Sequence, residues 1–211
     1  MGTETILLEE QKELRHRLRA RRCALSDDAR DEAARAVCSH LTAAEVFKQA
    51  RALSAYLAIN GELELRPIIE QAWAADKHVC LPVVTGGRGT VLEFRPFASD
   101  TRLTANRYGI EEPESDASGC PVEQLDLVLC PIVAFDDLGT RVGMGGGYYD
   151  ATFQSKLDNK SARPTLLGVA YDIQRVGSYL ERNEWDVPLD GVVTETGIRW
   201  FGDQENAWTT G

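Results

Sequence analysis

The segment Leu125-Asp-Leu-Val-Leu-Cys-Pro-Ile-Val-Ala-Phe135 decides the fold class, because it is a run of strand length whose only charged residue is Asp126. A near-continuous apolar strand is typical of a parallel sheet, in which both faces are covered. Further apolar runs predict strands at 52–59, 78–84, 91–97, 166–171 and 191–200. Helical segments separate several of these runs, so the sequence predicts an α/β protein with a largely parallel sheet.

Several stretches around the strands have helical character. Leu14 and Leu18 lie one helical turn apart in an arginine-rich N-terminal segment, and Ser26 followed by two aspartates marks a second helix start. Residues 65–77 and 150–157 predict further helices. We expect the chain to be organised as one α/β domain over 1–211, a helical segment 1–50 packed on the sheet, a loop at 101–120 and a frayed tail at 202–211.

Composition narrows the classes of partner. The chain has 211 residues and a formal net charge of −10, which argues against non-specific nucleic-acid binding, because that requires a basic surface. No apolar run approaches the ~18 residues of a membrane span. A protein with a negative net charge can still bind a small anionic ligand where arginines cluster locally. We therefore expect small-molecule substrates, no nucleic acid, no membrane, and a monomer or weak homo-oligomer.

Cysteine usage indicates a reducing, cytoplasmic compartment. The five cysteines are odd in number and none has Cys-x-x-Cys spacing, so the sequence predicts neither a disulfide framework nor a zinc site. A reactive thiol is the functional alternative. No flanking residue indicates an activated thiol, and small buried apolar side chains are the better interpretation. The residues are Cys23, Cys38, Cys80, Cys120 and Cys130.

The most informative motif is Arg141-Val-Gly-Met-Gly-Gly-Gly-Tyr-Tyr-Asp150, which follows the buried strand and precedes a predicted helix. Glycines at the carboxyl end of a strand let the backbone approach a phosphate and direct several N–H groups towards it. The motif lacks the Gly-Lys-Ser/Thr of a P-loop, and Tyr148 stands where a dinucleotide fingerprint needs a small residue. By itself, the cluster is as compatible with a tight turn as with a phosphate loop. Its flanks favour phosphate, since Arg141 can neutralise it and Asp150 can hold Mg²⁺ beside it.

The glycine motif and the strand before it resemble the 5-formyltetrahydrofolate cyclo-ligase family, also called 5,10-methenyltetrahydrofolate synthetase. The resemblance spans nearly the whole chain. It includes the basic N-terminal helix, Asn60-Gly-Glu62, Arg107-Tyr-Gly-Ile-Glu-Glu-Pro113 and Asp186-Val-Pro-Leu-Asp190, in the expected order. The glycine motif is highly specific for the family, whereas each of the other segments is weaker evidence when taken alone. The resemblance implies a three-layer α/β/α fold with a mostly parallel, Rossmann-like sheet.

The resemblance also implies an activity and a set of site residues. Members convert 5-formyltetrahydrofolate to 5,10-methenyltetrahydrofolate with MgATP and release ADP and phosphate. The implied ATP-binding residues are Gln11, Lys12, Arg15, Arg141, Val142, Gly143, Met144, Gly145, Gly146, Gly147, Tyr148 and Tyr149. The implied folate-binding residues are Leu57, Glu62, Tyr108, Met144, Gly145, Gly146, Gly147 and Tyr148. Asp150 and Asp186 match the magnesium-binding acids.

One departure concerns the nucleotide site, because the family usually has Lys where this chain has Gln11. Lys12 is adjacent, but one residue along a helix rotates the side chain by ~100°.

For several of the implied site residues, a purely structural explanation is also available. Glu62 alone would be a solvated loop acid, and Leu57 can serve as strand core. Tyr108 is as well explained by packing as by stacking, and acids such as Asp150 favour helix starts in any case.

Two rival functions come from other classes. A non-catalytic paralogue that binds folate or nucleotide is mildly favoured by Gln11. A sugar-phosphate isomerase or an acyl-CoA transferase on a similar sheet needs a positioned carboxylate base or nucleophile and no ATP. An assay with MgATP and 5-formyltetrahydrofolate distinguishes these classes.

Overall fold

The computed structural model describes residues 2–87, 89–114, 119–159, 163–202 and 208–209. Its main sheet has eight strands in the order β12-β11-β10-β9-β6-β1-β2-β3. In chain order the strands are β1 (Ala52–Ser54), β2 (His78–Val83), β3 (Glu93–Pro96), β6 (Leu127–Pro131), β9 (Thr165–Val169), β10 (Gly191–Thr194), β11 (Gly197–Trp200) and β12 (Trp208–Thr209).

The five central strands, from β10 to β2, pair in parallel, whereas β3, β11 and β12 add antiparallel edges. The sheet is therefore mostly parallel, as the apolar strand pattern predicts. Strand β6 lies in the middle of the sheet, and the side chains of Val128 and Leu129 are both fully buried. Burial on both faces explains why the strand reads as a continuous apolar run.

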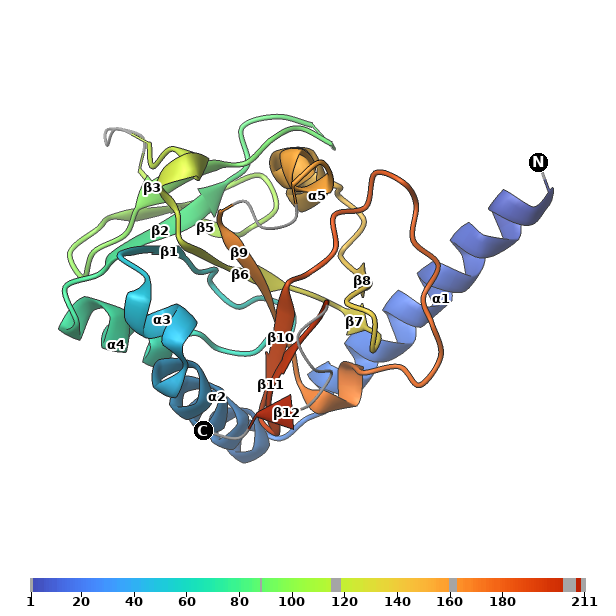
Figure 1. Ribbon diagram of the computed structural model, residues 1–211, viewed down its shortest axis with the longest axis horizontal. Helices are drawn as coiled ribbons and strands as arrows, with labels where there is room; N and C mark the ends of the chain where they lie inside the picture. The colour runs from blue at the N-terminus through green and yellow to red at the C-terminus, as the bar shows by residue number, and fades with distance from the viewer. Residues whose placement is uncertain (1, 88, 115–118, 160–162, 203–207, 210–211) are drawn as a thin grey trace.

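Helices cover the two faces of the sheet (Figure 1). Helices α2 (Asp27–Ala43), α3 (Glu45–Gln49) and α4 (Arg66–Ala74) pack on one face, where Val37 and Ile68 join a core that includes Leu129. Helix α5 (Tyr148–Phe153) covers the other face, where Phe153 packs in a second core with Val128. This arrangement gives the predicted three layers.

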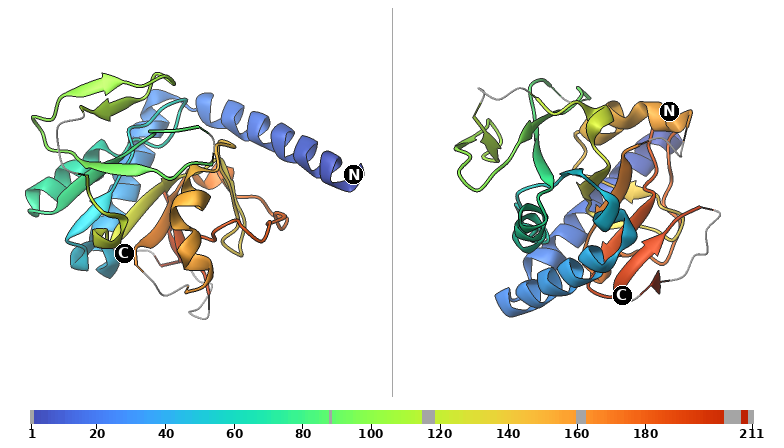
Figure 2. Two further views of the ribbon diagram at one scale, coloured as in Figure 1. Left: turned by 90° about the horizontal axis from the view of Figure 1, so that it is seen from above. Right: turned by 60° about the vertical axis from the view of Figure 1, so that its left-hand side comes forward.

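Helix α1 (Gly2–Cys23) extends beyond the body of the molecule at its N-terminal end (Figures 1 and 2). Towards its C-terminal end, Leu18 is buried against Val133, Ala134 and Val142, and Leu14 packs beside them. The helix thus lies against the small hairpin of β7 (Ala134–Phe135) and β8 (Arg141–Val142), which carries the glycine motif. No helix in the described part of the chain combines the length and apolar character that crossing a membrane requires.

Several predicted boundaries are wrong. The run at 52–59 forms a strand only to Ser54, and the run at 191–200 is a hairpin of two strands, β10 and β11. The polar segment at 101–120, expected to be a loop, contains the hairpin of β4 (Leu103–Ala105) and β5 (Glu111–Pro113). In the tail, β12 pairs with β11, while the expectation of fraying at 203–207 and 210–211 lies outside the described residues. Short 3₁₀ helices complete the chain as η1 (Val122–Gln124), η2 (Gln154–Leu157) and η3 (Asp172–Gln174).

The expectation that no disulfide forms is wrong for one pair, since Cys80 and Cys120 are joined. Cys80 lies in β2, and the antiparallel partner β3 brings Phe94, whose carbonyl accepts a hydrogen bond from Cys120 N at 2.7 Å. The pair is 40 residues apart in sequence, and its proximity depends on sheet pairing that cysteine spacing does not reveal. Cys23, Cys38 and Cys130 are free thiols.

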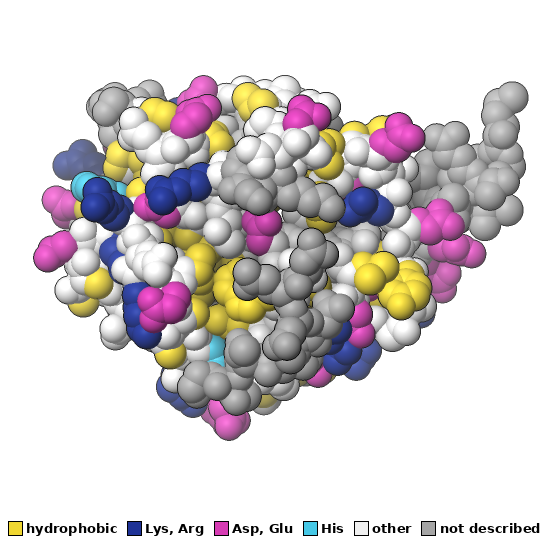
Figure 3. Space-filling model, viewed as in Figure 1, with side chains coloured by type: hydrophobic (Ala, Val, Ile, Leu, Met, Phe, Trp, Pro, Cys, Tyr) yellow, Lys and Arg dark blue, Asp and Glu magenta, His cyan; other side chains and the backbone are white. Residues whose placement is uncertain are grey.

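The face of the molecule in Figure 3 carries acidic and basic side chains interspersed among the described residues. The distribution is consistent with the acidic net charge.

Candidate active site

A cavity of about 940 Å³ lies at the carboxyl ends of β1, β2 and β6. These strands are neighbours in the sheet, so the segments that leave them meet at one edge. Residues 56–62 follow β1, residues 81–84 end β2, and residues 140–151 come after β6; members of all three segments line the cavity. Because ligands of open α/β sheets bind at this edge, the cavity is the candidate active site.

The cavity brings together nearly all of the residues that the sequence singles out. Lys12, which the resemblance implies as an ATP-binding residue, is instead exposed and lies outside the lining, because one residue along the helix rotates its side chain by ~100° from that of Gln11. The lining includes Gln11, Arg15, Leu57, Glu62, Tyr108, Arg141, Val142, Gly143, Met144, Gly145, Gly146, Gly147, Tyr148, Tyr149, Asp150 and Asp186.

The glycine motif begins in β8 and ends in α5, and its backbone conformation requires glycine at two positions. Gly145 and Gly147 have φ angles of +86° and +71°, in the left-handed region that other residues rarely adopt. Within the described part of the chain, the N–H groups of residues 143–147 donate no hydrogen bond to a protein acceptor. In contrast, the carbonyls of Gly143 and Gly146 accept hydrogen bonds from Arg15 and from Gly89 N. The loop therefore keeps a row of donors available to a ligand.

Arg15 connects α1 to this loop. Its Nε donates to the Gly143 carbonyl at 2.9 Å, and its Nη2 donates to Gln11 Oε1 at 3.1 Å. Burial lowers the pKa of Arg15, while the nearby Asp186 carboxylate opposes that shift. Gln11 thus supports a cation that faces the cavity, although it carries no charge itself.

Arg141 and Asp150 form an ion pair at the base of the loop, with Nη2 and Oδ1 2.6 Å apart. Arg141 also donates to the Val187 carbonyl, and Asp150 Oδ1 accepts from Val187 N at 3.0 Å. These contacts join the glycine loop, α5 and the segment that carries Asp186. Asp186 Oδ2 accepts from Asn183 N and Nδ2 at 2.8 and 3.1 Å.

Asp150 and Asp186 are the candidate metal ligands. No group of three or more His, Cys, Asp or Glu side chains suited to a metal occurs among the described residues. Mg²⁺ does not need such a group, because one or two carboxylates with substrate phosphates and water complete its octahedral shell. Both carboxylates line the cavity, and the hydrogen bonds that they accept from protein donors go to one oxygen of each. The donor set therefore fits Mg²⁺.

The wall opposite the glycine loop contains Leu57 and Glu62. Asn60 and Gly61, with φ angles of +51° and +73°, form a tight turn closed by a hydrogen bond from Glu62 N to Ile59 O at 3.0 Å. Glu62 is only 9% exposed, and burial raises the pKa of its carboxyl group although Arg22 acts in the opposite direction. The interpretation of Glu62 as a solvated loop acid is wrong.

Two tyrosines of the cavity lining contact each other. Tyr108 Oη and Tyr148 Oη are 3.0 Å apart, and the Arg107 guanidinium lies 4.9 Å from the centre of the Tyr108 ring. Tyr148 belongs to the glycine motif and Tyr108 to the turn between β4 and β5. The hairpin expected to be a loop thus supplies one edge of the site.

Comparison with known proteins identifies the family of the chain. Residues 8–195 match the model of the 5-formyltetrahydrofolate cyclo-ligase family. The chain belongs to the 5-formyltetrahydrofolate cyclo-ligase family. Enzymes named 5-formyltetrahydrofolate cyclo-ligase from Escherichia coli and Haemophilus influenzae are 36% and 34% identical over 182 residues, covering 86% of this chain and 98% and 95% of theirs.

A solved structure also resembles the chain. It is the 5,10-methenyltetrahydrofolate synthetase of Aquifex aeolicus, with a TM-score of 0.77 and 31% identity over 94% of this chain and 96% of that one. The fold and the family that the glycine motif indicates are therefore confirmed. The individual residue roles in this cyclo-ligase family member stay predictions.

Two buried residues of this cyclo-ligase family member were not predicted from the sequence. Glu112 is 7% exposed, lines the cavity, and accepts hydrogen bonds from Val84 N and Asn106 Nδ2 at 2.9 and 2.6 Å. Arg22 is 1% exposed and contacts Glu62, although it belongs to an arginine-rich helix, in which most arginines are expected to face solvent. A signal for Arg22 exists in the sequence, because it continues the spacing of Leu14 and Leu18 by one more helical turn.

Proposed function

We propose that this chain is an ATP- and Mg²⁺-dependent cyclo-ligase that converts 5-formyltetrahydrofolate to 5,10-methenyltetrahydrofolate and releases ADP and phosphate. Family membership supports the reaction class. The observation that carries the proposal is the glycine loop, whose N–H groups donate to no described protein acceptor and whose residues line the same cavity as Glu62 and Tyr108. One cavity thus offers a phosphate cradle and a wall for a second, flat substrate.

In this proposal the phosphates of ATP bind along the loop. The N–H groups of 143–147 donate to phosphate oxygens, and Arg15 and Arg141 balance their charge. Gln11 orients Arg15 through the contact of its side-chain oxygen with Nη2. The remaining loop residues, Val142, Tyr148 and Tyr149, shape the wall around the nucleotide.

The folate binds between the loop and the opposite wall. The Glu62 carboxylate accepts hydrogen bonds from the amino and ring N–H donors of the pterin edge, and Leu57 contacts the ring. Tyr108 and the segment from Met144 to Tyr148 close over the substrate. This placement directs the N5-formyl group towards the phosphates.

Asp150 and Asp186 are the residues that would hold Mg²⁺ beside the phosphates. The ion, when bound, neutralises charge on the transferring phosphoryl group. The ion pair with Arg141 and the hydrogen bond from Val187 N fix the orientation of Asp150. These contacts keep one carboxylate at the base of the loop before substrate arrives.

The reaction needs positioning and charge neutralisation more than a strong base. The formyl oxygen attacks the γ-phosphorus and ADP leaves, which gives an iminium phosphate at N5. N10 then attacks the formyl carbon, loses its proton, and the carbon–oxygen bond to phosphate breaks as the ring closes. Arg15, Arg141 and the loop N–H groups stabilise the charge that develops on the phosphoryl oxygens.

The rival functions require other catalytic groups in the cavity. An isomerase or acyl-CoA transferase would need a free carboxylate base or nucleophile, whereas both Glu62 and Asp150 are held by arginines. A binding paralogue remains an alternative because Gln11 replaces the family lysine. The contact of Gln11 with Arg15 favours an intact nucleotide site.

One assay tests the proposal against both rivals. The purified chain is incubated with MgATP and 5-formyltetrahydrofolate while the absorbance of the methenyl product is followed. We expect product formation that requires both ATP and Mg²⁺. Binding of ATP without turnover at any enzyme concentration would identify the paralogue, and turnover without ATP would identify another reaction.

A further inference from the structure

Arg22 lies in the last turn of α1 and is the most deeply buried arginine of the described chain, with 1% of its surface exposed. Its three nitrogens reach three different acceptors. Nε donates to the Asn60 carbonyl at 3.1 Å, Nη1 to the Ile132 carbonyl at 3.2 Å, and Nη2 to Glu62 Oε1 at 3.4 Å. The guanidinium therefore joins α1, the turn after β1 and the end of β6.

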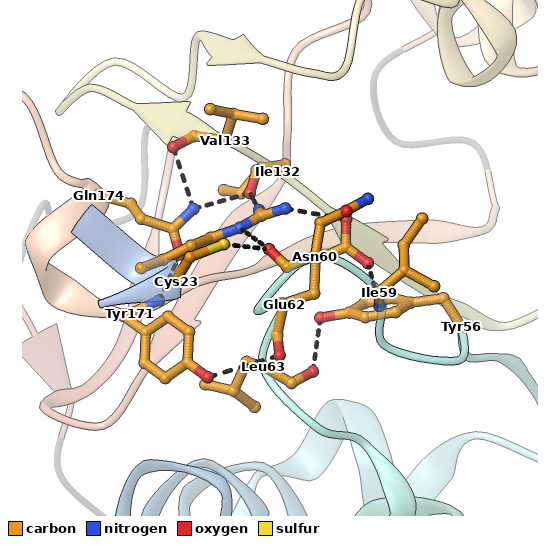
Figure 4. A network of polar contacts seen from close by, with 11 residues as sticks. Cys23, Tyr56, Ile59, Asn60, Glu62, Leu63, Ile132, Val133, Tyr171 and Gln174 are labelled. Atoms are coloured by element: carbon orange, nitrogen blue, oxygen red, sulfur yellow. Dashed lines mark hydrogen bonds and ion pairs between the residues drawn. The ribbon is translucent and has the colours of Figure 1, made fainter. Parts of the chain in front are cut away.

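Asn60 and Glu62 lie together in the turn after β1 (Figure 4), and the Glu62 carboxylate contacts this guanidinium. Oε1 receives Arg22, and Oε2 accepts a hydrogen bond from Ile59 N at 3.2 Å. The Glu62 carbonyl is also held, because Tyr171 Oη donates to it at 3.4 Å. A carboxylate has about four acceptor positions, so two remain for a ligand in the cavity.

The charge state of Glu62 depends on its surroundings. Burial raises its pKa, while Arg22 and, more weakly, Arg19 on the same helix lower it. The other titratable groups that act with Glu62 are Tyr56 and Tyr149, which are neutral at physiological pH. Among these groups, Arg22 is the main one that favours the ionised form of the buried carboxyl against the effect of burial.

We propose that Arg22 is a positioning residue that holds Glu62 as an oriented anion for recognition of the pterin edge. The inference rests on the proposed function, because it assigns Glu62 to the folate. An ionised carboxylate accepts two hydrogen bonds from adjacent amino and ring N–H groups, whereas a protonated one presents a donor to them. Arg22 itself does not touch substrate and acts only through Glu62 and its turn.

A purely structural role for Arg22 predicts a different result. Loss of packing would lower stability and reduce the affinity for both substrates or the amount of folded enzyme. A positioning role instead raises KM for 5-formyltetrahydrofolate, leaves KM for ATP near its wild-type value, and changes the pH dependence of the folate KM. A change in the KM for 5-formyltetrahydrofolate without a change in the KM for ATP therefore distinguishes the positioning role from the structural one.

The experiment compares Arg22→Gln with Arg22→Lys by steady-state kinetics from pH 5.5 to 8.5. Gln keeps a donor but no charge, so the Glu62 pKa rises further and the folate KM begins to increase at a higher pH than in the wild type. We expect at least about a 10-fold higher folate KM for Arg22→Gln at neutral pH, with less than about a 3-fold change in ATP KM. Arg22→Lys keeps the charge and should recover much of the loss and the wild-type pH profile.

Two further variants complete the test. Arg199→Met removes another buried arginine, which pairs with Asp137 away from the cavity, and should leave both KM values unchanged. In a Glu62→Gln background, Arg22→Gln should add little to the folate KM, because its partner is already gone. Additive effects, or equal increases in both KM values, would overturn the proposal.

Folding is checked by circular dichroism and thermal unfolding. Should Arg22→Gln not fold, Arg19→Gln keeps the inference testable, because Arg19 is only partly buried and acts on Glu62 in the same direction. It should shift the folate pH profile the same way by a smaller amount, and an unchanged profile would overturn the electrostatic role. If the wild-type enzyme makes no methenyl product, the proposed function is wrong, and this result is distinguishable from a failure of the Arg22 inference, which requires an active wild type.

Discussion

Single side chains set the charge of the site, and Arg141 links the glycine loop to two other segments of it. It bonds to both Asp150 and the Val187 carbonyl, so its removal frees a carboxylate and removes a cation from the phosphate cradle. We expect Arg141→Ala and Asp150→Ala each to lower turnover by about 100-fold or more while circular dichroism stays unchanged. Arg66→Ala, which removes an exposed pair with Glu70, should keep wild-type turnover. Near wild-type activity in both site variants would contradict these roles.

The glycine loop allows a second test at the residue scale. At Gly145 an added Cβ would meet nothing closer than 3.9 Å, so the cost of Gly145→Ala is conformational and comes from its φ of +86°. We expect a loss of about 1–2 kcal/mol in the free energy of unfolding, or a distorted loop with a higher KM for ATP. Gly177→Ala has open space and no left-handed φ, and should change neither quantity. Urea unfolding and ATP kinetics measure both outcomes.

At the scale of elements, the turn between β7 and β8 holds the segment that leads to Asp186. Asp136 is fully buried, and its Oδ1 accepts hydrogen bonds from Leu138 N and Thr140 N, while Oδ2 accepts from Leu180 N at 2.9 Å. Asp136→Ala leaves three backbone donors unpaired, one of them, Thr140 N, buried, so we expect a loss of about 2 kcal/mol in unfolding free energy. Amide exchange at Leu180 should accelerate more than exchange in β6. Uniform acceleration would show that the turn has no local role.

The elements also show what the sequence could and could not predict. Strand β6 and helix α4 were predicted because their apolar patterns are long and regular, although the run at 125–135 was too long, since Ala134–Phe135 forms β7 in a separate hairpin. The run at 52–59 was too long because its apolar residues beyond Ser54 serve the cavity wall and the core rather than the sheet. The hairpin of β10 and β11 was read as one strand, since its turn lacks Pro and Asn and its apolar residues continue on both sides.

The residues of the candidate site were named from the glycine loop and the family resemblance, not from regular patterns of apolar residues. Its residues come from segments far apart in sequence, and only the glycine loop indicates chemistry by itself. Glu62 needed the family resemblance, because an acid after Gly61 has no pattern that distinguishes a buried position from a solvated one. Arg22 was missed because a count of arginines in α1 indicates a solvated face, whereas its helical spacing from Leu18 places it on the buried one.

For the molecule as a whole, stability at low pH depends on the ion pairs that join distant segments. Asp137 accepts two hydrogen bonds from Arg175 and pairs with Arg199 in β11. The hydrogen bonds from Arg175 are the main cause that lowers the Asp137 pKa below its ordinary 3.8. A lowered acid pKa stabilises the fold above the ordinary value, and the contribution is lost as pH falls through the folded value. We expect the unfolding temperatures of wild type and Asp137→Asn to differ at pH 6, and the difference to shrink as the pH falls below 3.8.

The disulfide between Cys80 and Cys120 closes a loop of 40 residues that contains the β4–β5 hairpin and therefore Tyr108 and Glu112 of the cavity wall. Cross-linking a loop of this length restricts the unfolded chain, which stabilises the folded state by about 2–4 kcal/mol. We therefore expect Cys120→Ala, or reduction of the wild type, to lower the free energy of urea unfolding by that amount. Cys38→Ala removes a free, half-buried thiol and should change stability less. Peptide mapping without reductant checks the bond directly, and equal stability of the oxidised and reduced protein would contradict its role.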